Sequence, residues 1–172
     1  MIHPLAHCDG SCVIGPGTKV WQFASVIRAS FVGQRCNVGS CAIIDAARVG
    51  DDVTIGHGAQ LHPGTYIWHR VFIGPAVVFC NDRWPTVSKD GFEIDRLLKA
   101  ALSSKDKTVE VLSDASIGAN STILPGLKIG QGAMIAAGAN VDRDVPDFHL
   151  FKRDGSIVRI DKRQNARMRF AA

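Results

Sequence analysis

The chain has 172 residues, 46% of them hydrophobic and 21% charged, which is the length and composition of one folded domain. This composition excludes a disordered chain, and no apolar run approaches the roughly 18 residues of a membrane span. The first residues lack the basic and apolar regions of a signal peptide. Five cysteines, an odd number in a chain too long to need disulfides, predict a reducing, cytoplasmic setting.

The formal net charge of +4 is concentrated at the C-terminal end. Residues 146–172 contain three aspartates and seven basic residues: Lys152, Arg153, Arg159, Lys162, Arg163, Arg167 and Arg169. Such a tail binds an anionic ligand or forms a solvated face, and the sequence leaves both interpretations open. The rest of the chain has no basic stripe interleaved with aromatic residues, so we expect no nucleic-acid partner.

A repeat with a period of six residues runs through the chain. It is marked by twenty apolar residues, with a phase slip after Ile44 and a break after Phe79: Ile2, Cys8, Ile14, Val20, Val26, Val32, Val38, Ile44, Val49, Ile55, Leu61, Ile67, Ile73, Phe79, Val111, Ile117, Ile123, Ile129, Ile135 and Val141. A glycine often follows the apolar residue, and a small or apolar residue stands four positions after it. This period predicts a short strand and a turn, three of which close a triangular coil of about 18 residues.

The repeat predicts an all-β domain over residues 1–145, with about four coils before the break and two after it. Residues 81–110 form a long loop insertion, and residues 146–172 form a short basic C-terminal extension. Because long excursions from a regular coil tend to carry function, we expect the insertion to contribute to a site. Apolar residues at helical spacing within it, between Ile94 and Leu102, predict a short amphipathic helix, and a second helix is expected from about Gln164.

Three cysteines, Cys8, Cys12 and Cys36, fall on inward positions of the repeat, which favours core filling over metal binding. Cys80 lies off the inward positions beside Asn81, but no base that would activate a nucleophilic thiol is evident. We therefore expect neither a metal site at these cysteines nor a catalytic cysteine.

The repeat resembles that of the hexapeptide-repeat acyltransferases, which are left-handed parallel β-helices and usually homotrimers with active sites between subunits. Two segments narrow the resemblance to bacterial nucleotide-sugar N-acetyltransferases. TKVWQF at residues 18–23 resembles their TKIWHF segment, and VFIGPAVVFCNDRWP at residues 71–85 resembles their VFxGPxxxFxNDxxP segment. The resemblance implies transfer of an acetyl group from acetyl-CoA to the amine of a dTDP- or UDP-linked amino sugar, for surface polysaccharide synthesis.

By this resemblance, Asn81 and Asp82 lie at the amino end of the sugar. An amide orients the amine toward the thioester, and a carboxylate accepts its proton or holds a neighbouring hydroxyl. Arg83 and Trp84 follow in the same segment and are candidate substrate-binding residues. The family's glutamate one coil before the asparagine is replaced here by Pro63, so the neighbouring His62 is the candidate base.

The acyl-CoA arm in this family runs along the last coils, held by backbone amides of small residues after the apolar position. Ala119 and Ala137 are the corresponding residues here. The family's GNPA turn is replaced by FKRDG at residues 151–155, and its Lys152 and Arg153 are the candidates for the CoA phosphates.

Two other functions remain open. His57 and His62 are spaced like two zinc ligands of the γ-class carbonic anhydrases, which share the coil. A third ligand from an earlier coil is missing, because residues 8–56 contain no histidine. A non-enzymatic trimeric scaffold is the other alternative, and the long insertion with its Asn81–Asp82 pair argues against it.

Overall fold

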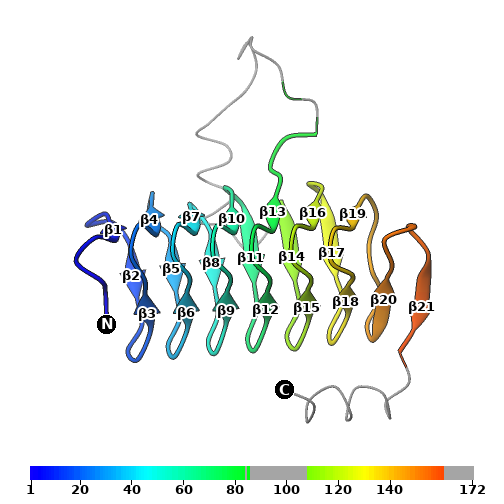
Figure 1. The fold of residues 1–172 in the computed structure, drawn as a ribbon, viewed down its shortest axis with the longest axis horizontal. Helices are drawn as coiled ribbons and strands as arrows, with labels where there is room; N and C mark the ends of the chain where they lie inside the picture. The colour runs from blue at the N-terminus through cyan, green and yellow to red at the C-terminus, as the bar shows by residue number, and fades with distance from the viewer. Residues whose placement is uncertain (84, 86–107, 161–172) are drawn as a thin grey trace.

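The chain forms one continuous coil of short parallel strands, with the coils stacked along the long axis of the molecule (Figure 1). The computed structural model describes residues 1–83, 85 and 108–160. Within these residues the secondary structure is β-strand, and each strand has two or three residues. Four full coils precede the break and two follow it. The predicted fold is confirmed: the chain is a left-handed parallel β-helix.

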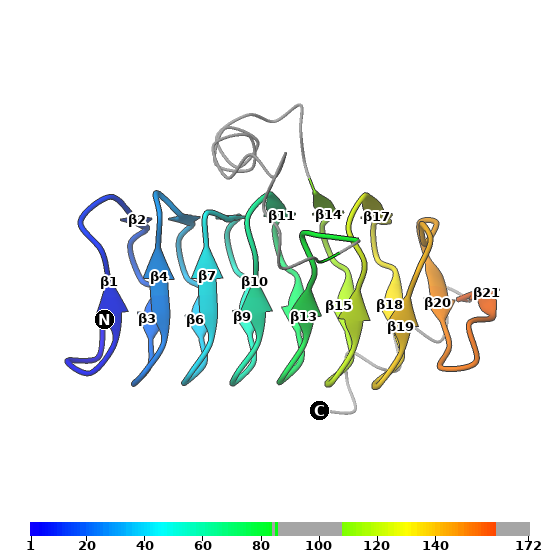
Figure 2. The ribbon, with the colours of Figure 1, turned by 90° about the horizontal axis from the view of Figure 1, so that it is seen from above.

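The strands form three sheets, which line the three sides of the coil and are seen from a second direction in Figure 2. Sheet I contains β1 (His7–Cys8), β4 (Ser25–Ile27), β7 (Ile43–Asp45), β10 (Gln60–Leu61), β13 (Val78–Phe79), β16 (Thr122–Ile123) and β19 (Asn140–Val141). Sheet II contains β2 (Val13–Ile14), β5 (Phe31–Val32), β8 (Arg48–Val49), β11 (Thr65–Ile67), β14 (Val109–Val111) and β17 (Leu127–Ile129). Sheet III contains β3 (Lys19–Val20), β6 (Asn37–Val38), β9 (Thr54–Ile55), β12 (Phe72–Ile73), β15 (Ser116–Ile117), β18 (Met134–Ile135), β20 (His149–Phe151) and β21 (Ile157–Arg159). We call the turns between sheets corner I/II, corner II/III and corner III/I.

The apolar residue of each repeat points into the coil, where equivalent residues of successive coils stack. Ile44, Leu61 and Phe79 are fully buried neighbours in sheet I. The first coil is less complete, because it has a neighbouring coil on one side only: Ile2 is 48% exposed. Cys36 is buried in the core, and Cys8 and Cys12 are partly buried against it, which agrees with their expected role as core residues.

Glycine is required where a corner of one coil touches the backbone of the next. A Cβ on Gly56 would lie 2.4 Å from the Pro75 nitrogen and 2.6 Å from the Gly74 carbonyl carbon, closer than any side chain tolerates. The third residue of many turns has a positive φ without being glycine, as at Arg35, Asp52 and Arg70. The corners therefore combine close backbone contact with a left-handed residue whose side chain points outward.

Three coils depart from the 18-residue length, and all three do so at corner I/II. The pairing Ile43↔Gln60 spans 17 residues, which explains the phase slip after Ile44. The pairing Phe79↔Ile123 spans 44 residues, since the insertion leaves the coil after β13 and returns before β14 (Figure 1). The bridge Ile129↔Val145 spans 16 residues. Corners II/III and III/I keep a constant length throughout the described coils.

The parallel coil runs past residue 145. Strand β20 pairs in parallel with β18, and β21 folds back on β20 in the antiparallel sense. The tight turn between β20 and β21 contains Lys152 and Arg153, so these two residues are part of the ordered coil end. The helices expected between Ile94 and Leu102 and from Gln164 fall outside the described residues. Among the described residues, none belongs to a helix long and apolar enough to cross a bilayer.

The stacked core predicts a large cost for truncating one inward residue. Ile117 is fully buried in β15, between coils on both sides. Ile117→Ala should lower the free energy of unfolding by about 2–5 kcal/mol, because it removes buried surface and leaves a cavity. Chemical denaturation measures the effect, with exposed Lys19→Ala as the control. Equal stability of the two variants would contradict an inward Ile117.

The backbone contact at Gly56 predicts a second effect on stability. Gly56→Ala should destabilise the coil by about 1–3 kcal/mol, because the added methyl group forces two backbones apart. Gly10→Ala is the matched control, since a Cβ there would have no neighbour within 4 Å. Thermal denaturation of both variants tests this prediction, which is wrong if Gly56→Ala has the same melting temperature as the wild type.

Candidate active site

Three of the predicted site residues lie on adjacent coils of corner I/II. Leu61 and Phe79 are register partners in sheet I, so His62 and Cys80 follow them side by side on adjacent coils. Asn81 and Asp82 come directly after Cys80, where the chain leaves the coil. The side chains of His62, Cys80, Asn81 and Asp82 are partly buried. The structure therefore brings His62 next to the start of the segment containing Asn81 and Asp82, although they are 19 and 20 residues apart in sequence.

The chemistry available at this turn is that of an amide, a carboxylate and an imidazole. The His62 main-chain oxygen accepts hydrogen bonds from the Thr65 N–H and hydroxyl, at 3.1 and 2.7 Å, which fix the turn. Burial raises the pKa of the Cys80 thiol, so this thiol stays protonated near neutral pH and is a poor nucleophile. Arg83 is exposed beside the pair, and Trp84 falls outside the described residues.

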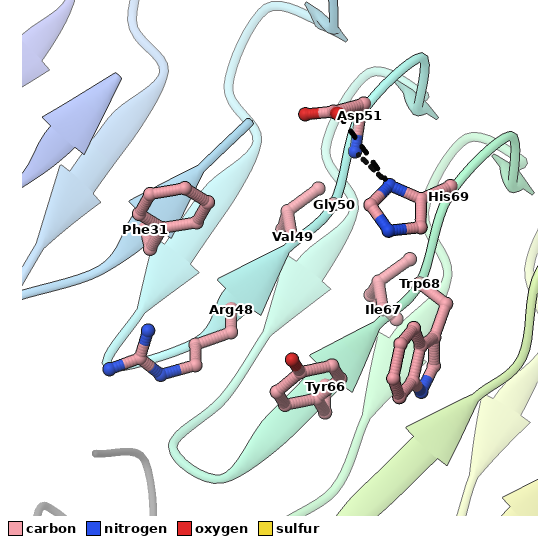
Figure 3. Close-up of a pocket in the computed structure, with 9 residues that line it drawn as sticks. All are labelled: Phe31, Arg48, Val49, Gly50, Asp51, Tyr66, Ile67, Trp68 and His69. Atoms are coloured by element: carbon pink, nitrogen blue, oxygen red, sulfur yellow. Dashed lines mark hydrogen bonds and ion pairs between the residues drawn. The ribbon is translucent and has the colours of Figure 1, made fainter. Parts of the chain in front are cut away.

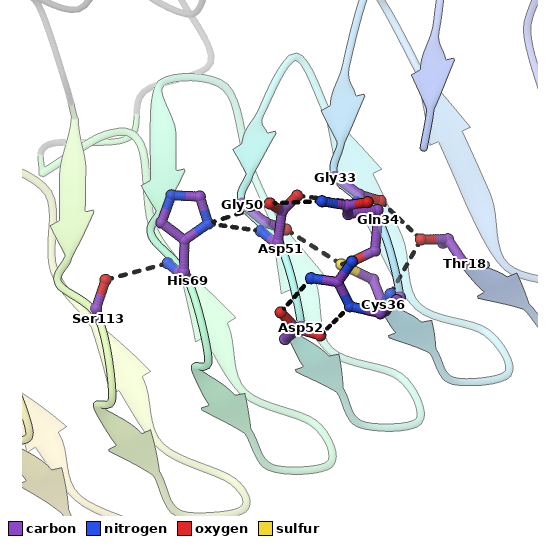
Figure 4. A network of polar contacts seen from close by, with 10 residues as sticks. Thr18, Gly33, Gln34, Cys36, Gly50, Asp51, Asp52, His69 and Ser113 are labelled. Carbon is purple, nitrogen blue, oxygen red and sulfur yellow. Dashed lines mark hydrogen bonds and ion pairs between the residues drawn. The ribbon is translucent and has the colours of Figure 1, made fainter. Parts of the chain in front are cut away.

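Corner II/III shows how the coil normally satisfies a turn amide (Figure 4). In three successive coils the N–H of the second residue of the turn points along the coil axis, where a side chain of the next coil accepts it. The Gln34 N–H donates to Asp51 Oδ1 at 3.0 Å, the Asp51 N–H to His69 Nδ1 at 2.9 Å, and the His69 N–H to the Ser113 hydroxyl at 3.3 Å. These side chains cap the turn amides of three successive coils in this corner.

Corner III/I begins in the same way and then changes. The Ser40 N–H donates to His57 Nδ1 at 3.0 Å, but the equivalent residues further along are Pro75, Ala119 and Ala137. Alanine has no acceptor with which to cap its neighbour. Within the described part of the chain, the N–H groups of Ala119 and Ala137 make no hydrogen bond. Two donors of fixed direction are thus open to a ligand on consecutive coils, at the two alanines expected from the sequence.

Basic side chains lie at the end of this open row. Arg153 Nε donates to the Ala137 oxygen at 3.3 Å, so the turn between β20 and β21 places its guanidinium beside the second alanine. Lys152 is its exposed neighbour. Arg143 joins them: its guanidinium donates to the Gly155 oxygen and lies 5.4 Å from the centre of the Phe151 ring. Sequence reasoning missed Arg143, because its position depends on the return of β20 to the coil.

The two groups of residues flank the same sheet. Ala119 and Ala137 lie in corner III/I, where the chain enters sheet I, and His62, Asn81 and Asp82 lie in corner I/II, where it leaves. Sheet I separates them within one chain. Bringing both to one substrate therefore requires a ligand that crosses this sheet or a second copy that supplies one of the two corners.

The histidine pair considered for zinc also divides between the two corners. His57 is exposed in corner III/I with Nδ1 occupied by the Ser40 N–H, and His62 lies beyond β10 in corner I/II. Among residues 1–83, 85 and 108–160, no three His, Cys, Asp or Glu side chains are grouped as metal ligands would be.

Known proteins share both the repeat and the coil. A family model described as the hexapeptide repeat of succinyl-transferase matches residues 31–62 and 113–143. The bifunctional protein GlmU of Listeria monocytogenes serotype 4a is 32% identical over 165 aligned residues, which cover 87% of this chain and 36% of GlmU. GlmU of Carboxydothermus hydrogenoformans is 30% identical with the same coverage. The chain spans about a third of the length of these curated relatives.

Three solved structures illustrate the same coil in other proteins. A mutant of perosamine N-acetyltransferase from Caulobacter crescentus, in complex with CoA and GDP-perosamine, is 21% identical with a TM-score of 0.52, covering 91% of this chain and 55% of that one. AntD, an N-acyltransferase from Bacillus cereus in complex with dTDP and 3-hydroxybutyryl-CoA, is 15% identical with a TM-score of 0.57, covering 98% and 83%. LpxA from Acinetobacter baumannii is 16% identical with a TM-score of 0.60, covering 99% and 78%.

At these identities the solved structures show the fold. The repeat in the sequence and the matching family model together show that the chain is built from hexapeptide repeats, and these repeats form the three-sided coil.

Proposed function

We propose that this chain transfers an acetyl group from acetyl-CoA to the amine of a dTDP- or UDP-linked amino sugar, for synthesis of a surface polysaccharide. The observation that supports this most is the open pair of amides at Ala119 and Ala137, which ends beside Arg153. Two solved structures with this coil contain CoA or an acyl-CoA together with a nucleotide or nucleotide sugar.

The open row matches the shape and polarity of an acyl-CoA. The pantetheine arm contains amide carbonyls, which accept hydrogen bonds from backbone N–H groups aimed along the coil. Arg153, Lys152 and Arg143 supply positive charge at the end of the row, where the CoA phosphates bind. This assignment gives the basic C-terminal segment an anionic ligand in place of a purely solvated face.

The reaction needs little more than orientation and a route for one proton. The amine nitrogen attacks the thioester carbonyl, the new C–N bond forms, and the C–S bond breaks to release CoA as its thiol. Asn81 orients the amine, Asp82 accepts its proton or holds a neighbouring hydroxyl, and His62 is positioned beside them as an alternative base. Arg83 and Trp84 bind the rest of the substrate.

The separation of the two corners supports a homotrimer with active sites between subunits. One copy presents the amide row of corner III/I, and its neighbour presents the turn with Asn81 and Asp82. Each site then contains residues from two chains, so the isolated chain has both halves but no complete site.

The open amides of Ala119 and Ala137 predict the effect of placing an acceptor side chain at residue 137, where it would accept the Ala119 N–H. Ala137→Asp places a carboxylate where it can accept the Ala119 N–H, as Asp51 does for Gln34, and it brings negative charge toward the phosphates. The dissociation constant for acetyl-CoA should rise about tenfold or more. Calorimetric titration measures it. Gln22→Asp is the matched control, because Gln22 has the same place in the turn at the far end of the corner. Equal weakening by both variants would refute the assignment.

The turn at corner I/II predicts a separate effect on turnover. Asn81→Ala and Asp82→Ala should each lower kcat/KM for the amino-sugar nucleotide by about 10²-fold or more, with acetyl-CoA affinity retained. The reaction is followed by a colour assay for the thiol of the released CoA. Asn140→Ala in β19 is the control. Unchanged turnover in both variants would remove these residues from the mechanism.

A further inference from the structure

A hollow of about 260 Å³ lies on the outer face of sheet II, where it meets corner II/III (Figure 3). Its walls come from three successive coils. Phe31 stands on one side, Tyr66 and Trp68 stand on the other, and Asp51 and His69 close the end at the corner. Neither the repeat nor the proposed catalytic turn accounts for this hollow.

The hollow exists because the row that contains Trp68 has no side chain in the two preceding coils. Those positions are Gly33 and Gly50. A Cβ on Gly50 would lie 2.9 Å from His69 Nδ1 and from the Trp68 carbonyl carbon, so the coil itself excludes a side chain there. Backbone therefore forms the floor, and a flat ligand can approach it closely.

The aromatic wall is held in place before any ligand arrives. The Tyr66 and Trp68 rings lie 5.3 Å apart between centroids, tilted by 50°. Trp68 Nε1 donates to Glu110 Oε1 at 2.9 Å, which fixes the indole against the next coil. Rigid aromatic faces of this kind stack on nucleobases, since every base has a π-face.

The polar groups are ordered along the hollow. Arg48 is the register partner of both Phe31 and Tyr66, so a guanidinium side chain emerges between the two aromatic rows. The N–H and side chain of Gln34 hold the pKa of the Asp51 carboxyl below its usual range, which leaves an ionised acceptor at the corner end. A cation at the end toward corner I/II and an acceptor at the end toward corner II/III suit a phosphate followed by a base with N–H donors.

The residues that line the hollow follow a fixed order with distance from the proposed catalytic turn. Strand β11 starts just after His62 and ends at Ile67, immediately before Trp68. From Thr65 to Trp68 the chain advances roughly 10 Å at about 3.3 Å per residue. The order from corner I/II is therefore the Asn81–Asp82 turn, then Arg48 and Tyr66, then Trp68 and Asp51. A nucleotide sugar has the same order of amino sugar, diphosphate and base.

We propose that this hollow binds the nucleoside diphosphate part of the substrate, with the base stacked on Trp68 and Tyr66 and the diphosphate bound by Arg48. The amino sugar then reaches toward corner I/II. This inference rests on the proposed function, because the order of the groups has meaning only for a nucleotide-linked substrate.

In the experiment, the full chain is titrated separately with dTDP, UDP and GDP, and binding is measured by isothermal titration calorimetry. Trp68→Leu and Arg48→Gln should each raise the dissociation constant of the diphosphate that binds by about 5- to 100-fold, the scale of one lost base stack or charged contact. Trp68→Phe keeps an aromatic face and should stay within about threefold of the wild type. The matched controls are Phe72→Leu and Lys19→Gln, exposed residues of sheet III, which should leave affinity unchanged.

Acetyl-CoA titration of every variant separates the two proposals and checks folding. Lost diphosphate binding with retained acetyl-CoA binding supports the hollow. Equal diphosphate affinity in all variants, or no diphosphate binding by the wild type, overturns it and leaves the acyltransferase proposal standing if acetyl-CoA binds. Diphosphate binding that depends on Trp68 without any acetyl-CoA binding supports the hollow and refutes the proposed function. If Trp68→Leu does not fold, Tyr66→Leu and Arg48→Gln give the same test.

Discussion

Backbone hydrogen bonding from coil to coil is the constraint on which this structure depends. Each short strand can satisfy its N–H and C=O groups only against the strands above and below it, so successive coils must stay in register. Equivalent residues are then stacked into straight rows, one for each position of the repeat. The buried row of Ile44, Leu61 and Phe79 is one result, and the surface rows are the other. The amide pair at Ala119 and Ala137 and the hollow on sheet II are therefore each formed by residues at equivalent positions of successive coils.

The corners differ in whether a side chain of the next coil accepts the hydrogen bond of the turn N–H. In corner II/III side chains cap the turn amides of Gln34, Asp51 and His69, and the outward residues alternate in charge. Asp52 accepts two hydrogen bonds of 2.7 Å from Arg35, which hold the pKa of the Asp52 carboxyl below its usual range. Asp114 accepts two hydrogen bonds from Arg70, at 2.8 and 3.0 Å. Corner III/I is open at Ala119 and Ala137. Donors held by a stack of strands need no reorganisation when a ligand arrives, so the rigidity of the coil itself favours binding.

The sequence predicts the core well, because a six-residue period determines which side chain faces inward whatever its identity. It also locates the phase slip after Ile44 and the exit of the chain at Asn81. It does not predict the return of β20, since the coil that leads to Phe151 is two residues short and the period is lost. The position of Arg143 is missed for the same reason. The alternation of Tyr66, Ile67 and Trp68 is visible in sequence, but their meeting with Phe31 depends on the register across a 17-residue coil.

The confinement of every irregular length to corner I/II has a consequence for how such a coil can change. Close backbone contacts hold corners II/III and III/I, and side-chain caps add to them in corner II/III, so an added residue at either corner would shift the strands that follow. Corner I/II has absorbed one residue fewer, two fewer and 26 more in different coils, and the rows on either side remain aligned. Variation in the number of residues per coil is thereby confined to corner I/II. Residues added at corner I/II would alter the surroundings of Asn81 and leave the turns of Ala119 and Ala137, across sheet I, unchanged. If the proposed function holds, specificity for the amino sugar can therefore change independently of specificity for the acyl-CoA.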